Sequence, residues 1–466
     1  MFCQLEVLRH CFPSSVRHIL EELPESLDET YERILREIRK PNQGHAHRLL
    51  QCLVVAARPL LVGELAEVLA FDFDVEGIPK LDVGWRWVDQ EAAVLSACSS
   101  LVIIVKHGNS RIVQFSHFSV KEFLTADRLA EPIRDVSRYH IRLEAAHTIL
   151  ARACLGVLLR LDDRVDRDNI KNFPLAQYAA QYWPTHARFK NTSSHIKGGM
   201  ERLFNADKPH YAAWLWIHDG DHNFGRRVPS MSTMRPEKPR TVPLYYAAML
   251  GFRDLAEHII AEHPEHVNAE SLDGAIPMYV AAEGGYADIL SLLHQHGGDV
   301  HWKTCFGGFS SLGIALIRGK LEAAQFLLDC GAEINAQDNG YRSPLFLAVE
   351  GGHIEITRML LKRGARTDTI DVLHCTPLHI AVTMSNIHGV RLLLEHGADV
   401  NVRDGAGETP SQIALQMRED EIAKLLSEYG AKSDVVSPLG LFTNSTMYLQ
   451  YRRQALLEAV GCYMAI

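Results

Sequence analysis

The feature that most constrains this chain is a repeat of 33 or 34 residues in its second half. Its anchor is a proline, or a serine in one copy, which recurs with spacings of 34, 34, 33, 33 and 33 residues. The six anchors are Pro243, Pro277, Ser311, Pro344, Pro377 and Pro410. An alanine lies four residues after each anchor, from Ala247 to Ala414. A unit that recurs in this way predicts a solenoid, in which each repeat packs on its neighbours.

Each repeat carries the signals of two helices. Proline suits the first position of a helix because its φ is already helical and its missing N–H would be unpaired there. The alanine lets neighbouring helices approach closely, and leucine pairs such as Leu360 with Leu361 give the second helix an apolar face. A glycine twenty residues after the anchor, such as Gly397, suits the left-handed residue that ends a helix. We expect His379 to form hydrogen bonds between repeats.

The strings TPLHIA at 376–381 and RLLLEHGADVN at 391–401 resemble the ankyrin repeat closely. This resemblance implies six repeats over 236–434, each with two antiparallel helices and a projecting hairpin, and a function in binding a protein partner. We expect the second and third repeats to be the most irregular, because Ser311 replaces the proline and the hairpin before it is longer. The first repeat carries an extra residue near Pro264, and the polar sixth repeat suits a cap of the solenoid.

The hairpins that precede the anchors are the predicted partner-binding surface, because their side chains project from the helical body. Tyr and Arg are also enriched among residues that dominate binding energies. The candidate residues are Asp338, Asn339, Tyr341, Arg342, His374, Arg403 and Asp404. For Asp338 and Asp404 an equally good interpretation is that they stabilise only their own turns. We expect Tyr341 and Arg342 to have less of a turn role.

The first half of the chain has helical and β-rich patterns in a recognisable order. Apolar spacing predicts two helices within 14–40, separated at Pro24, two more at 47–57 and 61–71, and another at 89–98. Two β-rich runs then occupy 101–116, which gives a winged-helix order over 45–130 after a helical segment at 1–44. Residues 131–235 are expected to form a helical connector with loops at 191–199 and 226–240, and 435–466 a tail. The predicted fold is therefore mainly α.

The strings LPESLDETYERIL, RPLLVGELAEVLAF and FSHFSVKEFLTA resemble the region that follows the NACHT nucleotide-binding domain in fungal NOD-like receptors of the STAND class. Many such receptors end in ankyrin repeats, so the resemblance implies ligand sensing or scaffolding in a receptor of this kind. His117 matches the histidine that touches the nucleotide phosphate in these receptors. The sequence has no G-x-x-x-x-G-K-[ST] motif, so we expect no nucleotide binding by this chain alone, and His117 to cap its helix. We also expect the chain to be a fragment that lacks the NACHT domain.

Charge argues against a nucleic acid partner. The formal net charge of −9 at pH 7 does not favour a surface that neutralises phosphates. The alternative that stays open is a DNA-binding regulator, with the helix at 89–98 as its recognition element and Lys106 and His107 in the wing. That helix is acidic rather than basic, which favours the protein-binding interpretation.

Metal, cofactor and catalytic sites are not indicated by any motif. The nine cysteines are scattered and never form C-x-x-C, which is typical of reduced cytoplasmic thiols. Histidine pairs such as His45 with His47, or His294 with His296, lack a third ligand at a suitable spacing. No G-x-S-x-G or H-E-x-x-H motif is present, and no apolar run approaches the roughly 18 residues of a membrane span. We expect a cytoplasmic, non-enzymatic protein without cofactor.

Overall fold

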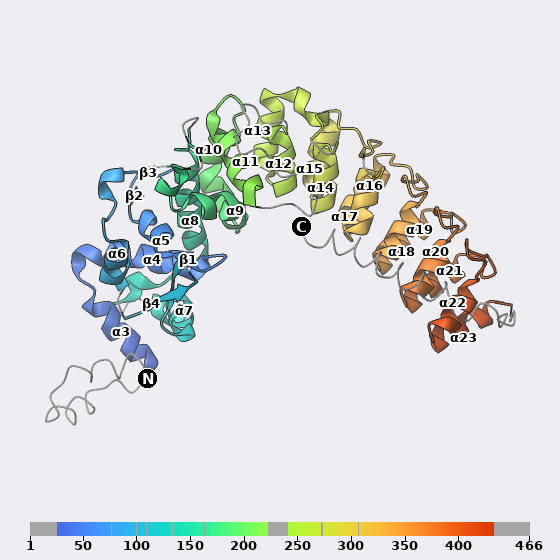
Figure 1. Cartoon of the computed structure of the whole chain (residues 1–466), viewed down its shortest axis with the longest axis horizontal. Helices are drawn as coiled ribbons and strands as arrows, with labels where there is room; N and C mark the ends of the chain where they lie inside the picture. Colours follow the sequence, from blue (N-terminus) through green and yellow to red (C-terminus); the bar gives the residue numbers. More distant parts are fainter. Residues whose placement is uncertain are drawn as a thin grey trace. The chain divides into compact units, whose positions relative to one another are not determined.

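The computed structural model describes residues 26–221 and 241–432, apart from 76, 99, 109, 132–134, 163–164, 167, 272–273 and 306. These residues belong to two compact units, the first up to 221 and the second from 241. Helices dominate both units, as Figure 1 shows, so the predicted mainly α fold is confirmed. The predictions for 1–25, for the loop at 226–240 and for the tail at 435–466 lie outside the described residues.

The first unit begins with a winged-helix domain. Its elements in chain order are α3 (Leu27–Glu37), η2 (Lys40–Asn42), α4 (Gln43–Val55), β1 (Leu60–Leu61), α5 (Val62–Val68), β2 (Phe71–Asp72), β3 (Lys80–Leu81), η3 (Val83–Trp85), α6 (Gln90–Cys98), β4 (Val102–His107), β5 (Ser110–Phe115) and α7 (Phe118–Thr125). The wing is the antiparallel pair β4 and β5, and β1 joins β5 to give the strand order β1-β5-β4. The predicted helix and strand order is confirmed, with the additional short hairpin of β2 and β3 before α6.

The region predicted as a connector packs on the winged-helix domain and completes the first unit. Its elements are η4 (Asp127–Ala130), η5 (Ser137–Tyr139), α8 (Leu143–Leu158), η6 (Ile170–Asn172), α9 (Ala176–Ala187), α10 (Thr192–Leu203) and α11 (Pro209–Asp221). Helix α8 packs against α4, α9 and α10. Trp183 of α9 and Trp214 of α11 are fully buried and meet edge to face, with ring centroids 6.2 Å apart.

The prediction of a loop at 191–199 was wrong, because most of these residues belong to helix α10. Ile196, Met200 and Leu203 follow helical spacing and are buried, and this apolar stripe outweighs the low helix propensity of two successive glycines. Gly199 is needed for the close packing of this helix. A Cβ atom at residue 199 would lie 2.4 Å from Cδ1 of Ile78.

The second unit is a stack of six helix pairs, which run from α12 to α23 in Figure 1. The pairs are α12 (Pro243–Leu250) with α13 (Arg253–Glu262), α14 (Pro277–Gly284) with α15 (Ala287–Gln295), α16 (Ser311–Ile317) with α17 (Leu321–Asp329), α18 (Pro344–Glu350) with α19 (Ile354–Lys362), α20 (Pro377–Thr383) with α21 (Ile387–Glu395), and α22 (Pro410–Gln416) with α23 (Asp420–Glu428). A short helix, η7 (Pro264–Asn268), follows α13. Each sequence anchor begins the first helix of its pair, and all six alanines at the fourth position are fully buried.

Two local predictions in the repeats are confirmed. The side chain of His379 bonds to Thr376 at the start of its own helix, and its Nε2 lies 3.2 Å from the carbonyl oxygen of Glu408 in the next repeat. The hairpin before the third repeat is wider than the others, because the N–H of Thr304 donates to the carbonyl of Phe309, five residues later. In the described part of the chain, none of the helices is both long and apolar enough to cross a membrane.

Candidate binding surface

Three consecutive hairpins are closed by an aspartate at the same position. Asp338, Asp371 and Asp404 lie 33 residues apart, and each is buried. In every case the Oδ1 atom accepts hydrogen bonds from the backbone N–H groups two and four residues later, at 2.8–2.9 Å. The aspartates therefore satisfy the backbone donors inside each turn, a role typical of Asp in tight turns.

Neighbouring hairpins are also joined to one another. The N–H of Asn339 donates to the carbonyl of Gly307 at 3.0 Å, and the N–H of Val372 donates to that of Gly340 at 3.1 Å. The N–H of Gly405 donates in the same way to the carbonyl of Leu373 at 2.8 Å. These bonds hold the hairpin tips in one continuous row along the solenoid.

Tyr341 and His374 occupy a position at which the backbone is left-handed, with φ values of 59° and 58°. Gly274 and Gly407 hold the equivalent position in other hairpins, with φ values of 74° and 82°. For a residue with a Cβ atom, this left-handed backbone conformation costs about 1–2 kcal/mol relative to a right-handed one, whereas glycine adopts it freely. Two hairpins therefore carry exposed side chains where glycine would be less strained.

The exposed tips form an apolar patch with polar neighbours. Tyr341 is 59% exposed, and Val372 in the adjacent hairpin is 57% exposed. We define the hairpin-tip surface by its exposed residues, which are Asn339, Tyr341, Ile370, Val372, Leu373, His374 and Arg403. The prediction named four of them and missed Ile370, Val372 and Leu373. The sequence signal that could have identified them is the string TIDVLHC at 369–375, which places three apolar residues in a hairpin of the repeat.

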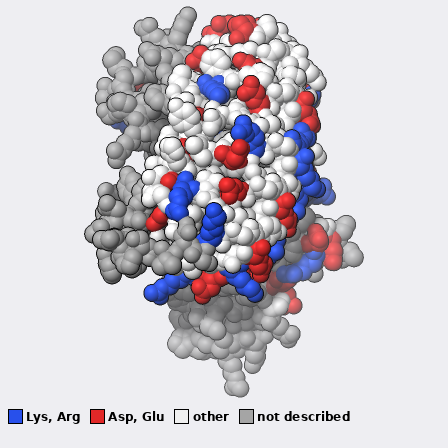
Figure 2. Space-filling view, turned by 90° about the vertical axis from the view of Figure 1, so that its right-hand side faces the viewer, with Lys and Arg blue, Asp and Glu red and all other residues white. Residues whose placement is uncertain are grey.

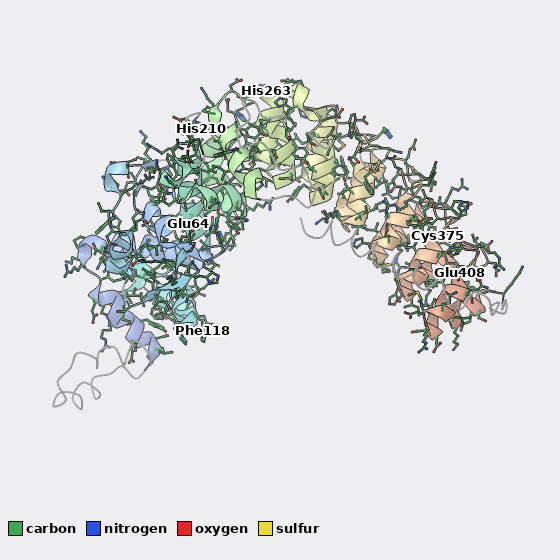
Figure 3. The ribbon with its side chains drawn as sticks, in the orientation of Figure 1. Glu64, Phe118, His210, His263, Cys375 and Glu408 are labelled. Atoms are coloured by element: carbon green, nitrogen blue, oxygen red, sulfur yellow. The ribbon has the colours of Figure 1, made fainter. Side chains whose placement is uncertain are left out.

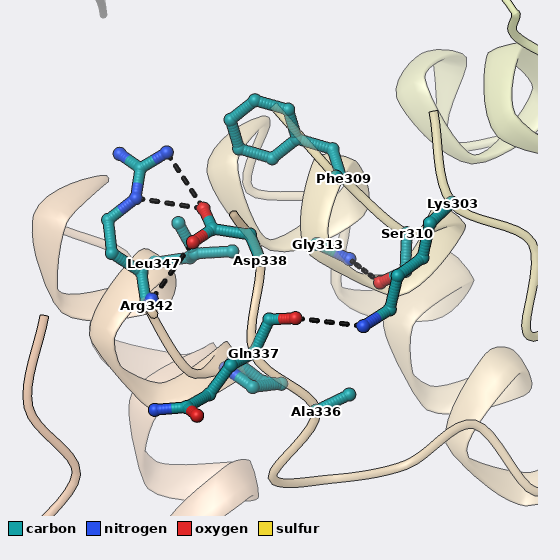
Figure 4. Close-up of a pocket in the computed structure, with 11 residues that line it drawn as sticks. Lys303, Phe309, Ser310, Gly313, Ala336, Gln337, Asp338, Arg342 and Leu347 are labelled. Carbon is teal, nitrogen blue, oxygen red and sulfur yellow. Dashed lines mark hydrogen bonds and ion pairs between the residues drawn. The ribbon is translucent and has the colours of Figure 1, made fainter. Parts of the chain in front are cut away.

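Arg342 is bonded to its own turn and to the helix that follows, so the expectation that it has less of a turn role was wrong. Its Nε donates to Asp338 Oδ2 at 2.9 Å, its Nη1 lies 3.2 Å from a carboxylate oxygen of Glu350, and its guanidinium lies over the ring of Phe309. Only 24% of the side chain is exposed. Figure 4 shows the pairing of Arg342 with Asp338 beside a pocket of about 10 Å³, which has room for no more than one water molecule.

The other predicted contact residues divide in two groups. Asp338 and Asp404 are buried, and their hydrogen bonds support the alternative that they stabilise their own turns. Asn339, His374 and Arg403 are exposed at the tips, although Arg403 also donates to the carbonyl of Gly407 at 2.7 Å. Their contact with a partner stays a prediction.

His117 caps helix α7, as expected. Its Nδ1 accepts a hydrogen bond from the N–H of Ser119 at 3.3 Å and lies 2.6 Å from the hydroxyl oxygen of the same residue. That hydroxyl also bonds to Tyr31 of α3 at 2.7 Å. The nucleotide-sensing role that the resemblance implies for His117 stays a prediction.

The winged-helix domain gives little support to the DNA-binding alternative. Helix α6 contains no Lys or Arg, Ala93 and Val94 on it are buried, and Glu91 forms an ion pair with Arg111 of β5. Lys106 and His107 are exposed in the wing. Figure 2 shows the side of the molecule that carries the last ankyrin repeats, where basic and acidic side chains are also intermingled rather than separated into a patch of one sign.

Comparisons with known proteins agree with this architecture. A family model of ankyrin repeats matches residues 244–338, 337–404 and 375–437, and the winged helix domain of GPI inositol-deacylase matches residues 31–133. Azaphilone pigments biosynthesis cluster protein L of Monascus ruber is 32% identical over 295 residues, which cover 60% of this chain and 61% of that protein. Ankyrin repeat and SAM domain-containing protein 6 of Mus musculus is 32% identical over 115 residues, 24% of this chain and 13% of that protein.

The chain spans less than two thirds of the length of these relatives. It contains an N-terminal winged helix domain and C-terminal ankyrin repeats, and the repeats support a module for protein–protein interaction.

Proposed function

We propose that this chain is a non-enzymatic recognition protein, and that its partner is a protein bound by the hairpin-tip surface. The observation that carries the proposal is the exposed apolar row of Tyr341, Ile370, Val372 and Leu373 on hairpins that are hydrogen-bonded to one another. Contiguous exposed apolar side chains with polar neighbours are typical of interaction sites.

The rigidity of the hairpins also supports this proposal. Each of the three aspartates accepts two backbone hydrogen bonds inside its turn, so little conformational freedom remains to be lost when a partner binds. Tyr341 and His374 keep side chains at left-handed positions, despite the strain that glycine would avoid. Retention of strain at an exposed position is typical of a functional site.

The finer part of the proposal concerns biological context. We propose that partner recognition serves signalling or non-self recognition in a NOD-like receptor architecture, without nucleotide binding by this chain alone. Its support is the winged helix domain before the ankyrin repeats, together with the resemblance of residues 23–35 and 115–126 to the segment that follows a NACHT domain.

The test is affinity capture of partners from cells by the full chain and by the double variant Tyr341→Ala with Val372→Ser. We expect the variant to lose specific partners at least about ten-fold, since central aromatic contacts are often worth 2 kcal/mol or more. The matched control is Leu415→Ser with Tyr429→Ala. These residues lie in the sixth repeat and are 54% and 42% exposed.

The control variant is expected to capture the same partners as the parent chain. If both double variants retained all partners while folded, the interface would lie outside the hairpin-tip surface. If both lost them equally, the loss would reflect general surface apolarity, and the proposed site would be wrong.

A further inference from the structure

The first ankyrin repeat departs from the others directly after its second helix. In repeats two to six, the residue twenty positions after the anchor is a glycine with φ between 80° and 93°. In the first repeat this position holds His263, with φ of −135°, and the chain continues into the short helix η7. His263 is labelled in Figure 3.

One inserted residue accounts for this departure. Asn268 donates to the carbonyl of Gly297 at 2.9 Å and accepts from the N–H of Asp299 at 2.9 Å. Asn401 makes the same pair of bonds, to Gly430 and Lys432, in the fifth repeat. Asn268 lies five residues after His263, whereas Asn401 lies four residues after Gly397. The solenoid is therefore in register on both sides of the insertion, and packing between repeats does not require the extra turn.

The insertion brings three potential ligands together. Among the described residues, His263, Glu265 and His266 form a group whose ligand atoms all lie within 4.8 Å of one another. Nδ1 of His263 is 3.1 Å from Oε1 of Glu265, and Nε2 of His266 is 3.9 Å from the same oxygen. The two imidazole rings are stacked, with centroids 4.8 Å apart and an interplanar angle of 20°.

We propose that His263, Glu265 and His266 bind a divalent first-row transition metal ion, with Zn²⁺ as the best fit. Two imidazole nitrogens and one carboxylate oxygen are ligands that zinc accepts, whereas Mg²⁺ and Ca²⁺ prefer oxygen ligands alone. Zinc bonds of about 2.0–2.2 Å in a tetrahedral site place ligand atoms roughly 3.3 Å apart. The 3.1 Å between Nδ1 of His263 and Oε1 of Glu265 already fits this value. The longer distances between ligand atoms would shorten by rotation of the side chains when the ion binds.

The exposure of the cluster suits such a site. Glu265 is 66% exposed, whereas His266 is only 14% exposed. Because the side chains of His263 and Glu265 are 35% and 66% exposed, an ion can reach the cluster from solvent.

The test is a calorimetric titration of the full, chelator-treated chain with ZnCl₂, beside Glu265→Gln and His266→Gln. We expect each substitution to remove about one equivalent of bound Zn²⁺, or to weaken its binding at least about ten-fold. The matched control is Glu395→Gln with His388→Gln, an exposed carboxylate and histidine on α21. The control should bind Zn²⁺ like the parent, and metal-free melting curves of all variants should agree with it.

Because the chain has nine cysteines, a second probe must separate thiolate from imidazole binding. Co²⁺ bound by the cluster is expected to give visible absorption without the near-ultraviolet charge-transfer bands of a thiolate ligand, and to lose that absorption in Glu265→Gln. Zinc uptake that is unchanged in both variants would overturn the proposal. So would cobalt absorption that disappears only on alkylation of the cysteines.

Discussion

The two units differ in how far apart in the sequence their polar contacts lie. In the first unit the carboxylate of Glu67 accepts from the N–H of Leu175, 108 residues later, and the hydroxyl of Tyr178 accepts from the N–H of Ala57, 121 residues earlier. In the second unit the ring of His353 bonds to the carbonyl of Ile317, only 36 residues away in the preceding repeat.

This difference predicts different responses to mutation. In a solenoid each repeat interacts only with its neighbours, so a local change is felt mainly in adjacent repeats. In the first unit, buried or partly buried polar groups join the winged-helix domain to the start of α9, so the loss of one such group is expected to destabilise the whole unit.

The largest effect is expected from Glu67→Ala. The Glu67 side chain is 2% exposed and lies between Arg86 and the N–H of Leu175, which is 2.7 Å from Oε2. Its removal leaves a buried donor and a partly buried cation unpaired, at a cost of about 3–5 kcal/mol. Urea unfolding followed by tryptophan fluorescence measures this loss, because five of the six tryptophans lie in the first unit.

Glu67→Gln is the control for that prediction, because it keeps an acceptor for Leu175 and removes only the charge. A smaller loss is expected for Gln than for Ala. Equal stability of the Ala variant and the parent would show that long-range polar contacts do not hold the first unit together.

The next effect is expected in the second unit, from Ala348→Leu and Ala381→Leu. Both alanines are fully buried in the first helices of their repeats, so a larger side chain overpacks the helix interface by about 1–3 kcal/mol. Hydrogen exchange read by mass spectrometry should show faster exchange in the substituted repeat and its neighbours. Exchange in the first unit should not change, and a loss of protection there would contradict the contrast between the units.

A pH effect is expected in the first unit through His186. Its Nδ1 lies 3.0 Å from Nδ1 of His147, and its Nε2 lies 2.9 Å from the hydroxyl of Tyr178. Burial, with His147 beside it, lowers the pKa of His186 to about 3. The unfolded chain takes up the proton near pH 6.5, so stability is lost as the pH falls from about 6.5 towards 3.

Between pH 7 and pH 5 this loss amounts to up to about 2 kcal/mol. Chemical unfolding at the two pH values measures it. The decrease should be smaller in His186→Gln, which has no such proton to bind, and an identical pH dependence in parent and variant would show that His186 is not responsible.

The smallest effect on stability is expected from Tyr341→Gly. Glycine removes the strain of the left-handed backbone but adds freedom to the unfolded chain, so the net gain is at most about 1 kcal/mol. The same substitution removes the exposed ring from the hairpin-tip surface, so partner binding should weaken while the melting temperature stays equal or rises. A marked fall in the melting temperature would mean that Tyr341 has a packing role.

The two units also differ in how well the sequence predicts them. The repeats were predicted closely because their main contacts recur at intervals of 33 or 34 residues, and the alanine, proline and glycine signals recur with them. In the first unit, α10 was missed because its apolar face is defined by Ile78 and Leu155, which are far away in the sequence. The neighbouring Gly198 and Gly199 wrongly indicated a loop.

The sequence by itself determined the winged helix and ankyrin architecture, since periodicity and local helix signals depend on neighbouring residues. Only the tertiary structure decided which hairpin side chains are free to meet a partner. Arg342 and Tyr341 are adjacent in the sequence, yet Arg342 turns back to Asp338 and Glu350 while Tyr341 projects into solvent. The grouping of His263, Glu265 and His266 likewise required the extra turn of η7, because ligand geometry depends on backbone direction rather than on spacing alone.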